Sequence, residues 1–587
     1  SADMDTLIAL GTGTAYVAGV VGAVTHAAML TFHDAAMILT FITLGRLLEA
    51  KTKGRASQAI RQLLQLTPPV ANVLDGDQIV EVAVAGVAVG QTIVVRPGDK
   101  VPLDARVVAG ESDVDQAWLT GESVPVAKHV GDVIYAGTIN GRSALQAVVL
   151  HASGETSLAQ TIELVRKAQE SKSDMQRLAD RVVSWFVPGV LVAAALTLAV
   201  WLLLGEPRTA LTCMVSVLIV ACPCALGLAT PTAILVGSGR GAEQGILIKN
   251  AQTLEQAGRI DTVVLDKTGT ITLGQPHVVQ LLPSHDSDPR QLLATAAAAE
   301  KLSGHPLAQA VMTAAAAQGV DADPAETLEV VPGEGIVCRH RGAEVVVGTE
   351  QLLSRWGVDL HALDRDALDR HRARGQTALL VATHQRLLGT ILVADPLAPH
   401  SAEAIAGLRR VPLDVIMLSG DKQITAAAVA RQVGIERVLA EVNPADKQHA
   451  VARLQRDGRT VAMVGDGIND APALVTADLG IALGTGADVA IESADIVLVR
   501  QDLRQVLEAI LLARATLRTI RQNLVWAFLY NLTLIPLAAG VVVPLAGPGT
   551  LHLLPSLSAA AMALSSVSVV ANSLALRYRR LLPRQTV

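Results

Sequence analysis

Aspartates follow three short apolar runs between residues 262 and 466. The segments are Thr262–Leu265 with Asp266, Val415–Leu418 with Ser419, Gly420 and Asp421, and Val461–Val464 with Gly465 and Asp466. Ligands of an open parallel sheet bind outside the carboxyl ends of its strands. We therefore expect these acids to meet in one crevice, although they lie far apart in the sequence.

A crevice lined by these acids suits phosphoryl transfer. A carboxylate such as Asp266 can attack a phosphoryl group and hold it as an acyl phosphate. A second carboxylate nearby would repel the first, so a Mg²⁺ ion between them is expected. A lysine is needed against the phosphoryl charge, and Lys447 is the candidate. A single strand-end aspartate would more simply be a helix cap or turn, but three of them, with DKTGT intact at 266–270, favour catalysis.

Two cysteines flank a proline inside an apolar run at 211–236. Pro223 removes a backbone hydrogen bond and opens the helix, so freed carbonyls and the thiols of Cys222 and Cys224 face one point at membrane depth. Thiolates select soft ions such as Cu⁺ or Zn²⁺ over Mg²⁺ or Ca²⁺. Membrane cysteines elsewhere would more simply be packing residues. Beside a helix-breaking proline, they indicate a metal site.

The elements that must position these groups include apolar stretches of near membrane-spanning length. These stretches cover residues 6–24, 35–50, 185–204, 211–236, 524–546 and 553–576. The loops within successive pairs hold a single Lys or Arg, whereas the ends that face the long polar segments are basic. The positive-inside rule therefore places both long segments and the C-terminus in the cytosol. Buried helices of a soluble protein are the alternative.

The length and composition of the chain agree with a multidomain membrane protein. The 587 residues are too many for one core, and 51% are hydrophobic while 17% are charged. The net charge of −6 gives no sign of a nucleic-acid partner, and four cysteines cannot form a disulfide framework in so long a chain. Segment 56–178 alternates valines with Gly and Pro turns, which predicts a β-rich domain. Segment 245–515 alternates apolar strands with Ala-rich helices, which predicts an α/β domain.

The segments DKTGT at 266–270, SGD at 419–421 and GDGIND at 465–470 resemble the phosphorylation domain of P-type ATPases, a haloacid-dehalogenase-like fold. The resemblance implies Asp266 as the nucleophile, with Asp266, Asp466 and the Thr268 carbonyl as magnesium ligands. It implies catalytic roles for the surrounding residues Lys267, Thr268, Ser419, Gly420, Asp421, Lys447, Asn469 and Asp470. The family usually has Thr in place of Ser419, and because the hydroxyl is kept we expect little change.

Further motifs resemble other domains of the same family. The pairs His305-Pro306 and Gly333 with Gly335 resemble the His-Pro and glycine motifs of the nucleotide domain in the heavy-metal subgroup, which implies ATP binding there. The subgroup commonly has Glu where this chain has Gly304, so one adenine-side contact differs. The segment TGES at 120–123 resembles the actuator loop, which implies that Glu122 promotes hydrolysis of the aspartyl-phosphate.

The last two apolar stretches bear on which soft ion fits. No Asp, Glu, Lys or Arg lies between Asn523 and Leu576, and two thiolates alone offset a monovalent charge. Tyr530-Asn531 and Met562 with Ser565-Ser566 resemble the pattern of the copper-transporting subgroup of class IB ATPases. The resemblance implies a Cu⁺ site formed by Cys222, Cys224, Tyr530, Asn531, Met562 and Ser566. Zinc exporters also carry CPC, but with a Lys and an Asp in these spans.

The resemblance extends to the ion route. Met4, Glu49 and Asp180 resemble the subgroup's cytosolic entry residues, with interfacial charge as the alternative for the two acids. The subgroup often has a Glu at the outer start of the second stretch, where this chain has His33-Asp34, so the exit route stays open. Family members usually begin with Cys-x-x-Cys domains and two extra helices. A truncation and a natural short form both remain open.

The sequence thus predicts a multidomain membrane protein with a bundle of six helical spans, a β-rich actuator domain, a haloacid-dehalogenase-like α/β phosphorylation domain and an inserted α+β nucleotide-binding domain. The boundaries are 1–55 for the first two spans, 56–178 for the actuator, 179–244 for spans three and four, 245–277 and 396–515 for the phosphorylation domain, 278–395 for the nucleotide domain and 516–587 for the last spans. The implied activity is ATP- and Mg²⁺-dependent export of Cu⁺ from the cytosol across the plasma membrane, with a cytosolic copper chaperone as a partner. A zinc or cadmium pump, and a metal sensor or regulated phosphatase, are the alternatives.

Overall fold

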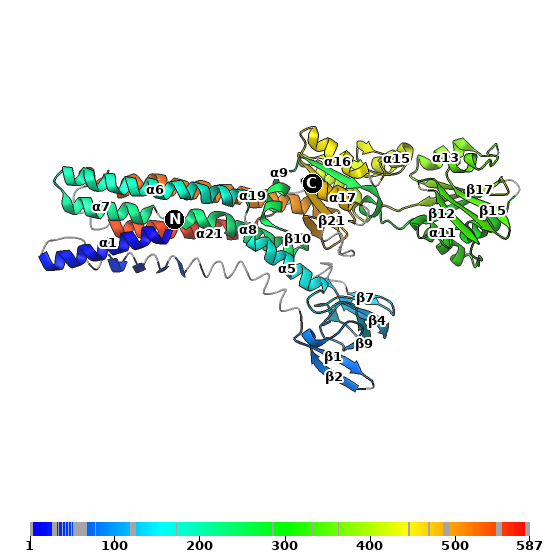
Figure 1. The fold of residues 1–587 in the computed structure, drawn as a ribbon, viewed down its shortest axis with the longest axis horizontal. Helices are drawn as coiled ribbons and strands as arrows, with labels where there is room; N and C mark the ends of the chain where they lie inside the picture. The colour runs from blue at the N-terminus through cyan, green and yellow to red at the C-terminus, as the bar shows by residue number, and fades with distance from the viewer. Residues whose placement is uncertain are drawn as a thin grey trace. The chain divides into compact units, whose positions relative to one another are not determined.

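The computed structural model describes residues 4–25, 32, 35–37, 39–40, 43–44, 46–47, 50, 67–76, 78–117, 125–171, 173–221, 224–284, 287–331, 333–361, 363–443, 446–467, 470–484, 493–546 and 554–581. The chain divides into two compact units, Ser1–Arg259 with Glu508–Val587, and Ile260–Leu507. The first unit holds the β-rich domain and the apolar helices, and the second holds the α/β domain with its insert (Figure 1).

The β-rich domain contains a larger and a smaller sheet with antiparallel pairing. The larger has the order β2 (Gln78–Ala83), β1 (Val70–Asp75), β3 (Thr92–Val95), β9 (Leu145–Val149), β4 (Ala105–Ala109), β7 (Val133–Ile134), and the smaller the order β6 (Val126–Lys128), β5 (Ser112–Asp115), β8 (Ile139–Asn140). Alternate residues of β4 and β9 are buried, as expected of strands with one face on a core. Ile93, Leu103, Ile134 and Leu145 belong to that core.

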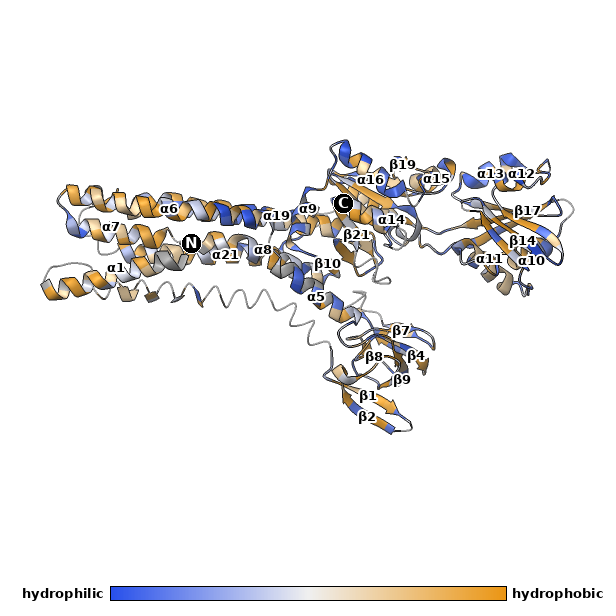
Figure 2. Cartoon of the chain, viewed as in Figure 1, coloured by the Kyte–Doolittle hydropathy of each residue, from blue (hydrophilic) through white to orange (hydrophobic). Residues whose placement is uncertain are grey.

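Long apolar helices make up most of the rest of the first unit, and Figure 2 shows hydrophobic residues along them. They are α1 (Met4–Thr25), α6 (Asp174–Leu203), α7 (Pro207–Val220), α8 (Cys224–Glu243), α19 (Arg504–Ala538) and α21 (Leu554–Ala575). The short helix α20 (Val543–Ala546) comes after α19, and the turn η5 (Leu576–Tyr578) follows α21. Within the described residues, three stretches are long and apolar enough to cross a membrane: Asp174–Leu203, Pro207–Glu243 and Leu554–Tyr578. They coincide with the predicted spans 185–204, 211–236 and 553–576.

The structure does not show the other three predicted spans as continuous membrane-spanning helices within the described residues. In α1 the apolar stretch, Ala9–Val21, is shorter than a span, and most of 35–50 lies outside the described residues. The predicted span 524–546 is not one helix, because α19 ends at Ala538 and Gly540 turns the chain with a φ of +90° before α20. The count of six spans therefore stays a prediction.

The helices of the bundle differ in how deeply they are buried. In the apolar window of Pro207–Glu243, 80% of the residues are buried within the protein, compared with 17% for α6. The side chains of Val192 and Leu196 on α6 are 59% and 60% exposed. An apolar surface of this kind is suited to lipid rather than to water. The stretch formed by α7 and α8 is therefore the centre of the bundle.

The second unit contains a parallel sheet covered by helices. Its strand order is β22 (Ile496–Leu498), β21 (Leu479–Leu483), β20 (Val461–Gly465), β11 (Thr262–Asp266), β18 (Asp414–Leu418), β19 (Arg437–Leu439). The helices are α14 (Ser401–Arg409), α15 (Gln423–Val433), α16 (Lys447–Arg456) and α17 (Ala471–Thr476). Strands β11, β20 and β21 are fully buried, which explains why they read as continuous apolar runs rather than alternating ones.

An α+β module is inserted between β11 and β18. Its antiparallel sheet has the order β12 (His277–Pro283), β17 (Arg386–Ala394), β16 (Thr377–Thr383), β15 (Ala343–Gly348), β14 (Gly335–His340), β13 (Thr327–Val331). Its helices are α10 (Pro289–Glu300), α11 (Pro306–Ala317), α12 (Glu350–Arg355) and α13 (Arg365–Arg372). One core contains residues of α10 and α11, and a second contains residues of α12. The predicted fold class is confirmed in these domains.

Short connecting elements of the first unit link its domains along the chain. They are α5 (Ser157–Glu170), which precedes α6, and β10 (Ile246–Ile248) and α9 (Ala251–Arg259), which precede β11. Thr156 caps α5 by accepting from Ala159 N, and Ser173 caps α6 by accepting from Gln176 N. The boundaries of both helices are therefore set by polar side chains in the sequence.

Candidate active site and transport site

The register of the parallel sheet brings the ends of three strands to one edge. Asp266 pairs with Leu418 between β11 and β18, so Ser419 follows at the same edge. Leu265 pairs with Val464 between β11 and β20, so Asp466 lies just past the level of Asp266. The acids that the sequence places after separate strands are thus neighbours in space.

Lys447 lies between two buried carboxylates. Its Nζ is 2.7 Å from Asp266 Oδ1 and 2.6 Å from Asp470 Oδ1, and each of the three residues is at most 7% exposed. Burial raises the pKa of the Asp266 carboxyl, the charges of Asp470 and Asp466 raise it further, and Lys447 opposes them. Burial alone would lower the pKa of Lys447, but the two carboxylates hold that pKa above its usual value. The lysine therefore stays charged, and the acids favour further positive charge.

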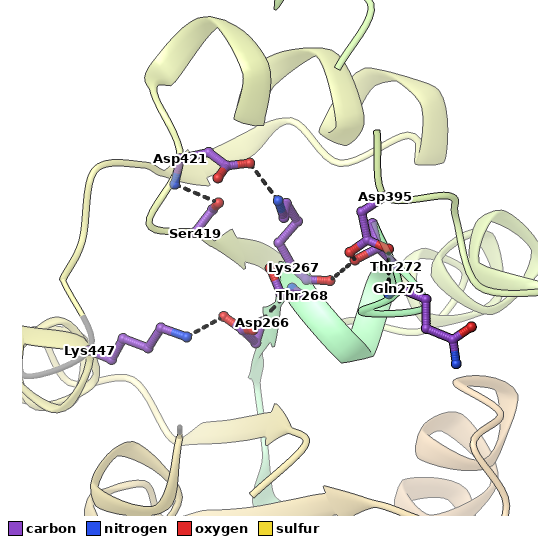
Figure 3. Close-up of polar contacts among 9 residues, drawn as sticks. All are labelled: Asp266, Lys267, Thr268, Thr272, Gln275, Asp395, Ser419, Asp421 and Lys447. Atoms are coloured by element: carbon purple, nitrogen blue, oxygen red, sulfur yellow. Dashed lines mark hydrogen bonds and ion pairs between the residues drawn. The ribbon is translucent and has the colours of Figure 1, made fainter. Parts of the chain in front are cut away.

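The turn after Asp266 is held by hydrogen bonds from two strand ends (Figure 3). The Thr268 amide donates to Asp266 Oδ2 over 3.1 Å, and the Lys267 ammonium pairs with Asp421. The Asp421 amide in turn donates to Ser419 Oγ over 3.1 Å. The segments DKTGT and SGD therefore form one connected polar structure with the carboxylate of Asp266 at its base.

Two residues of this site were not anticipated from the sequence. Asp395, directly after β17, accepts from Thr272 Oγ1 over 2.6 Å and from the Gln275 amide over 3.1 Å, and so anchors the turn (Figure 3). It repeats the pattern of an acid after an apolar strand, which was the available signal. The second residue that was not anticipated is Gly465. A Cβ at this position would lie 2.4 Å from Asp470 Oδ2. Only glycine lets this carboxylate approach β20 so closely.

The acidic edge fits a Mg²⁺ ion held by few protein groups. Among the described residues, no group of three or more His, Cys, Asp or Glu side chains forms a metal cluster. Mg²⁺ usually takes one or two carboxylates and completes its shell with water and substrate phosphate. The backbone of the turn at Gly269, which has a φ of +74°, lies against the Asp466 carboxylate, since a Cβ there would be 3.3 Å from Oδ2. Asp266, Asp466 and the Thr268 carbonyl would hold the ion, which would offset the negative charge of the edge.

Two predicted catalytic residues lie outside the described residues. They are Asn469, beside Asp470, and Glu122 of the TGES segment in the β-rich domain. Gly420 is described and lies between Ser419 and Asp421 in the loop after β18. The roles of Asn469 and Glu122 stay predictions.

In the inserted module, His305 stands at the start of α11, with Pro306 as the first helical residue. Its Nδ1 accepts from the Leu307 amide over 3.2 Å, so a neutral ring carries its proton on Nε2. Burial lowers the pKa of His305, which favours that neutral form. A neutral Nε2–H is a donor suited to a ring nitrogen of a nucleotide base.

A buried acid near His305 was missed in the sequence. Glu300, the last residue of α10, is 6% exposed, and burial raises its pKa to about 7, with only a hydrogen bond from Ser303 opposing. It also lies near Cys338 of β14, whose own pKa burial raises to about 11. An acid at the end of an Ala-rich helix gives no local sign of burial, so the sequence offered no signal.

The glycines of the GEG motif have different roles in the structure. Gly335 has a φ of +145°, and a Cβ there would lie 2.2 Å from the Val347 carbonyl oxygen. Gly348 opposite is equally tight, since its Cβ would lie 2.2 Å from the Glu334 carbonyl oxygen. Gly333 has no described heavy atom within 4 Å of such a Cβ. Gly335 thus serves close backbone packing, and Gly333 leaves an open backbone that a ligand can approach.

In the bundle, a face of α19 that carries two asparagines packs against α8. Asn523, Ala527 and Asn531 are four residues apart and share one helix face. Asn523 Nδ2 donates to the Ala229 carbonyl over 3.1 Å, and Ala527 belongs to one apolar cluster with Ala225. The helices therefore run in opposite directions, and Asn531 lies level with the junction between α7 and α8.

Helix α21 meets the same junction from another side. Ser573 Oγ accepts from Asn523 Nδ2 over 2.9 Å, Val569 belongs to the cluster of Ala225, and Met562 belongs to a cluster with Ile219 of α7. Ser566 lies between Met562 and Val569 on α21, so it is level with the junction between α7 and α8. Met562 and Ser566 are each 6% exposed, so both face other helices rather than lipid.

The remaining transport residues are only partly described. Cys222 lies outside the described residues, and Cys224 begins α8 at the junction, with its side chain outside the description. Tyr530, next to Asn531 on α19, is half-buried, and its ring centre is 6.4 Å from that of Trp526.

The tentative entry and exit residues are the least described of all. Met4 begins α1, Asp180 is an exposed residue of α6, and Glu49, His33 and Asp34 lie outside the described residues. The roles of these residues stay predictions.

Comparisons with known proteins agree with this architecture. Residues 65–166 match the P-type ATPase actuator domain, and residues 260–478 match the haloacid dehalogenase-like hydrolase family. A probable copper-transporting ATPase, PacS, of Synechococcus elongatus is 47% identical over 100% of this chain and 79% of that protein. Probable copper-exporting P-type ATPase V of Mycobacterium tuberculosis is 47% identical over 98% of this chain and 74% of that protein.

The fold has a solved counterpart as well. The crystal structure of a zinc-transporting PIB-type ATPase in the E2.Pi state superposes with a TM-score of 0.57 and 32% identity, covering 98% of this chain and 90% of that one. With the strand-end site, the actuator match and the relatives aligned along almost its full length, the chain belongs to the heavy-metal (class IB) P-type ATPases, in the subgroup whose named members are copper transporters.

Proposed function

We propose that this chain exports Cu⁺ from the cytosol, driven by transfer of the γ-phosphoryl group of ATP to Asp266. The observation that carries the proposal is the common level of Asn531, Met562 and Ser566 at the junction where α8 begins with Cys224. Helices from three parts of the sequence present sulfur, amide and hydroxyl groups there. These groups suit a soft monovalent ion.

The phosphoryl chemistry follows from the strand-end site. The Asp266 carboxylate attacks the γ-phosphorus, the bond to the bridging oxygen breaks, and ADP leaves. Lys447, 2.7 Å from Asp266 Oδ1, is positioned to offset the charge on the phosphoryl oxygens. Water then attacks the aspartyl-phosphate, Glu122 takes its proton, and inorganic phosphate leaves with the carboxylate restored. Mg²⁺, when bound, supplies positive charge between the carboxylates and the phosphoryl group.

The nucleotide site is proposed in the inserted module. His305 would contact the adenine through Nε2, and the open backbone at Gly333 would allow the nucleotide to approach. Gly335 acts through the backbone fold of β14, and Pro306 through the start of α11.

The second candidate is a zinc or cadmium pump. It is favoured by the fold, since the superposed crystal structure is of a zinc-transporting ATPase. Against it, the chain has no Asp, Glu, Lys or Arg between Asn523 and Leu576, so no carboxylate is present there to offset a divalent charge. The neutral groups of α19 and α21 support Cu⁺.

Location, partner and domain limits complete the proposal. The export direction fits a plasma membrane with both large segments in the cytosol, and a cytosolic copper chaperone would deliver an ion that is scarcely free in solution. Met4, Glu49 and Asp180 are proposed as the entry route. The predicted boundaries, with the actuator at 56–178 and the nucleotide domain at 278–395, are retained as part of this proposal.

Metal-dependent phosphorylation tests the proposal. The full chain in liposomes is incubated with γ-labelled ATP, Mg²⁺ and one of Cu⁺, Zn²⁺ or Cd²⁺. Acid-stable label that depends on Cu⁺ and disappears in Asp266→Asn is the expected result. Label that responds to Zn²⁺ alone would replace copper with zinc, and vesicle transport that survives Asp266→Asn would exclude the aspartyl-phosphate cycle.

A further inference from the structure

The actuator domain is rigidly joined to the helix that follows it. The carboxylate of Asp104, 1% exposed in the β-rich core, accepts hydrogen bonds from the Ser157 amide over 2.7 Å and the Ser157 hydroxyl over 2.9 Å. The same carboxylate accepts from the Ala136 amide over 2.8 Å. Because Ser157 is the first residue of α5, this buried acid ties the N-terminus of α5 to the sheet, so a movement of the domain moves α5.

At the far end of α5, two hydrogen bonds join the chain to α9. The Ser171 hydroxyl accepts from the amide of Ala251, the first residue of α9, over 2.7 Å. In the opposite direction, Glu255 Oε1 of α9 accepts from the Met175 amide, in the first turn of α6, over 2.9 Å. Each helix start is thus capped by a side chain of the other segment.

Glu255 is unusual for a simple helix cap. It is 2% exposed, and its second oxygen has no hydrogen-bond partner among the described residues. Among the described residues it pairs with Arg259, whose Nη2 is 3.9 Å away on a side chain that is 56% exposed. Burying a carboxylate with so few partners is costly, and a neutral cap would serve stability alone. The acid therefore has a further role, and its position gives one: α9 precedes β11, which ends at Asp266.

We infer that Glu255 is a positioning residue that transmits movement of the actuator domain, through α5, to the helix preceding Asp266. The inference rests on the proposed function, in which the actuator loop promotes hydrolysis of the aspartyl-phosphate. Asp104 carries the movement into α5, and the Ser171 and Glu255 bonds carry it into α9. Loss of the carboxylate separates the start of α6 from α9 and slows hydrolysis, whereas formation of the phosphoenzyme uses Asp266 and Lys447 and continues.

The test separates formation of the phosphoenzyme from its decay. The full chain, Glu255→Ala, Glu255→Gln and the control Gln252→Ala, an exposed position on the same helix, are labelled with γ-labelled ATP, Mg²⁺ and Cu⁺, and decay is followed after chelation. Glu255→Ala should form phosphoenzyme at the parent rate and lose it about fivefold more slowly, the equivalent of one ordinary hydrogen bond. Glu255→Gln keeps an oxygen for the Met175 amide but loses the charge that strengthens the bond, so it should slow decay by less than Glu255→Ala does, and Gln252→Ala should match the parent.

Each outcome decides the inference. Decay at the parent rate in Glu255→Ala overturns it, and so does a fall of formation and decay together in proportion to the folded fraction, which would mean a structural role. If Glu255→Ala does not fold, Ser171→Ala removes the reciprocal bond and must show the same selective slowing. Absence of Cu⁺-dependent label in the parent would instead count against the proposed function.

Discussion

The phosphorylation site and the transport site differ in the charge of the groups that form them. At the strand ends, Asp266, Asp470 and Lys447 are buried, and the Lys447 ammonium lies within 2.7 Å of both carboxylates. The pKa of each of the three groups is raised. At the α7–α8 junction, the described groups are the uncharged Asn531, Met562 and Ser566 in apolar surroundings. In the proposed function the first site holds phosphoryl oxygens and Mg²⁺, which require hard, charged partners, and the second holds an ion that prefers sulfur.

The two sites also differ in how they are held. The acids stand at strand ends whose register is fixed by ladders between β11, β18 and β20. The transport groups stand on helix faces, and their level is set by a few contacts such as the bonds of Asn523 to Ala229 and Ser573. A strand end offers little freedom, whereas helices can shift past one another. The rigid site therefore fits chemistry at one fixed point, and the helical site fits an ion that must be admitted and released.

Removing the cation from the charged site should have the largest effect. Lys447→Met leaves Asp266 and Asp470 as adjacent buried acids and removes a donor from the phosphoryl oxygens, so the rate of phosphoenzyme formation should fall about 10²–10³-fold. Single-turnover labelling with γ-labelled ATP and Cu⁺ measures this rate. Lys447→Met with Asp470→Asn relieves the repulsion and serves as the control for stability, without restoring the rate. Formation within about tenfold of the parent would show that buried charge is not what defines this site.

Glu300, a buried acid that forms no ion pair with the described residues, should respond to pH. Burial raises the pKa of Glu300 from 4.5 to about 7, so the folded chain binds this proton more tightly than the unfolded chain does. The resulting stability is fully present below pH 4.5 and is lost as pH rises through 7. Glu300→Gln imitates the neutral acid, so at pH 8 it should stabilise the inserted module by up to about 3 kcal/mol and at pH 5 by little. Native-state hydrogen exchange of the α10 amides measures the difference, with Glu163→Gln on exposed α5 as control. Equal effects at both pH values would mean that Glu300 is not held neutral.

The sequence anticipated one site better than the other for physical reasons. Asp266, Asp421 and Asp466 follow apolar runs, and the geometry of a parallel sheet dictates that such ends meet. Their convergence could therefore be derived before the structure was known. Asp395 also follows an apolar strand, but β17 belongs to the antiparallel sheet of the insert, so the geometry of the parallel sheet does not predict its place.

Other features depended on tertiary contacts that no local pattern reveals. Glu300 ends α10, a helix that shares its core with α11 and β14, and Gly348 is constrained by the backbone of Glu334 and Gly335 opposite. The stretch 524–546 has the composition of a span, but Gly540 breaks it with a positive φ. Hydropathy measures composition over a window, so it does not register a single turn.

Replacing the soft ligand should have a smaller effect than removing Lys447. Met562→Leu keeps the volume and the apolar contacts with α7 but loses the thioether, so the Cu⁺ concentration for half-maximal ATPase activity should rise about tenfold, or 1.4 kcal/mol. The control is Leu564→Met, since Leu564 is 59% exposed and faces away from the junction. Cu⁺ titration of ATPase activity in liposomes measures both. An unchanged Cu⁺ dependence in Met562→Leu would remove this sulfur from the transport site and weaken the contrast between the two regions.

The smallest effect is expected where the charged site departs from its family. Ser419 is 1% exposed, and its hydroxyl accepts from the Asp421 amide, which keeps Asp421 beside Lys267. Ser419→Thr keeps that oxygen and adds a methyl group after a strand, where β-branched residues are favoured, so phosphorylation should stay within about twofold of the parent. Ser419→Ala removes the acceptor and should slow phosphorylation by about tenfold, since the part-buried Asp421 amide loses its partner. Single-turnover labelling compares the two variants directly. If Thr were as damaging as Ala, shape rather than the hydroxyl would position Asp421, and the charged site would depend on packing in the way the transport site does.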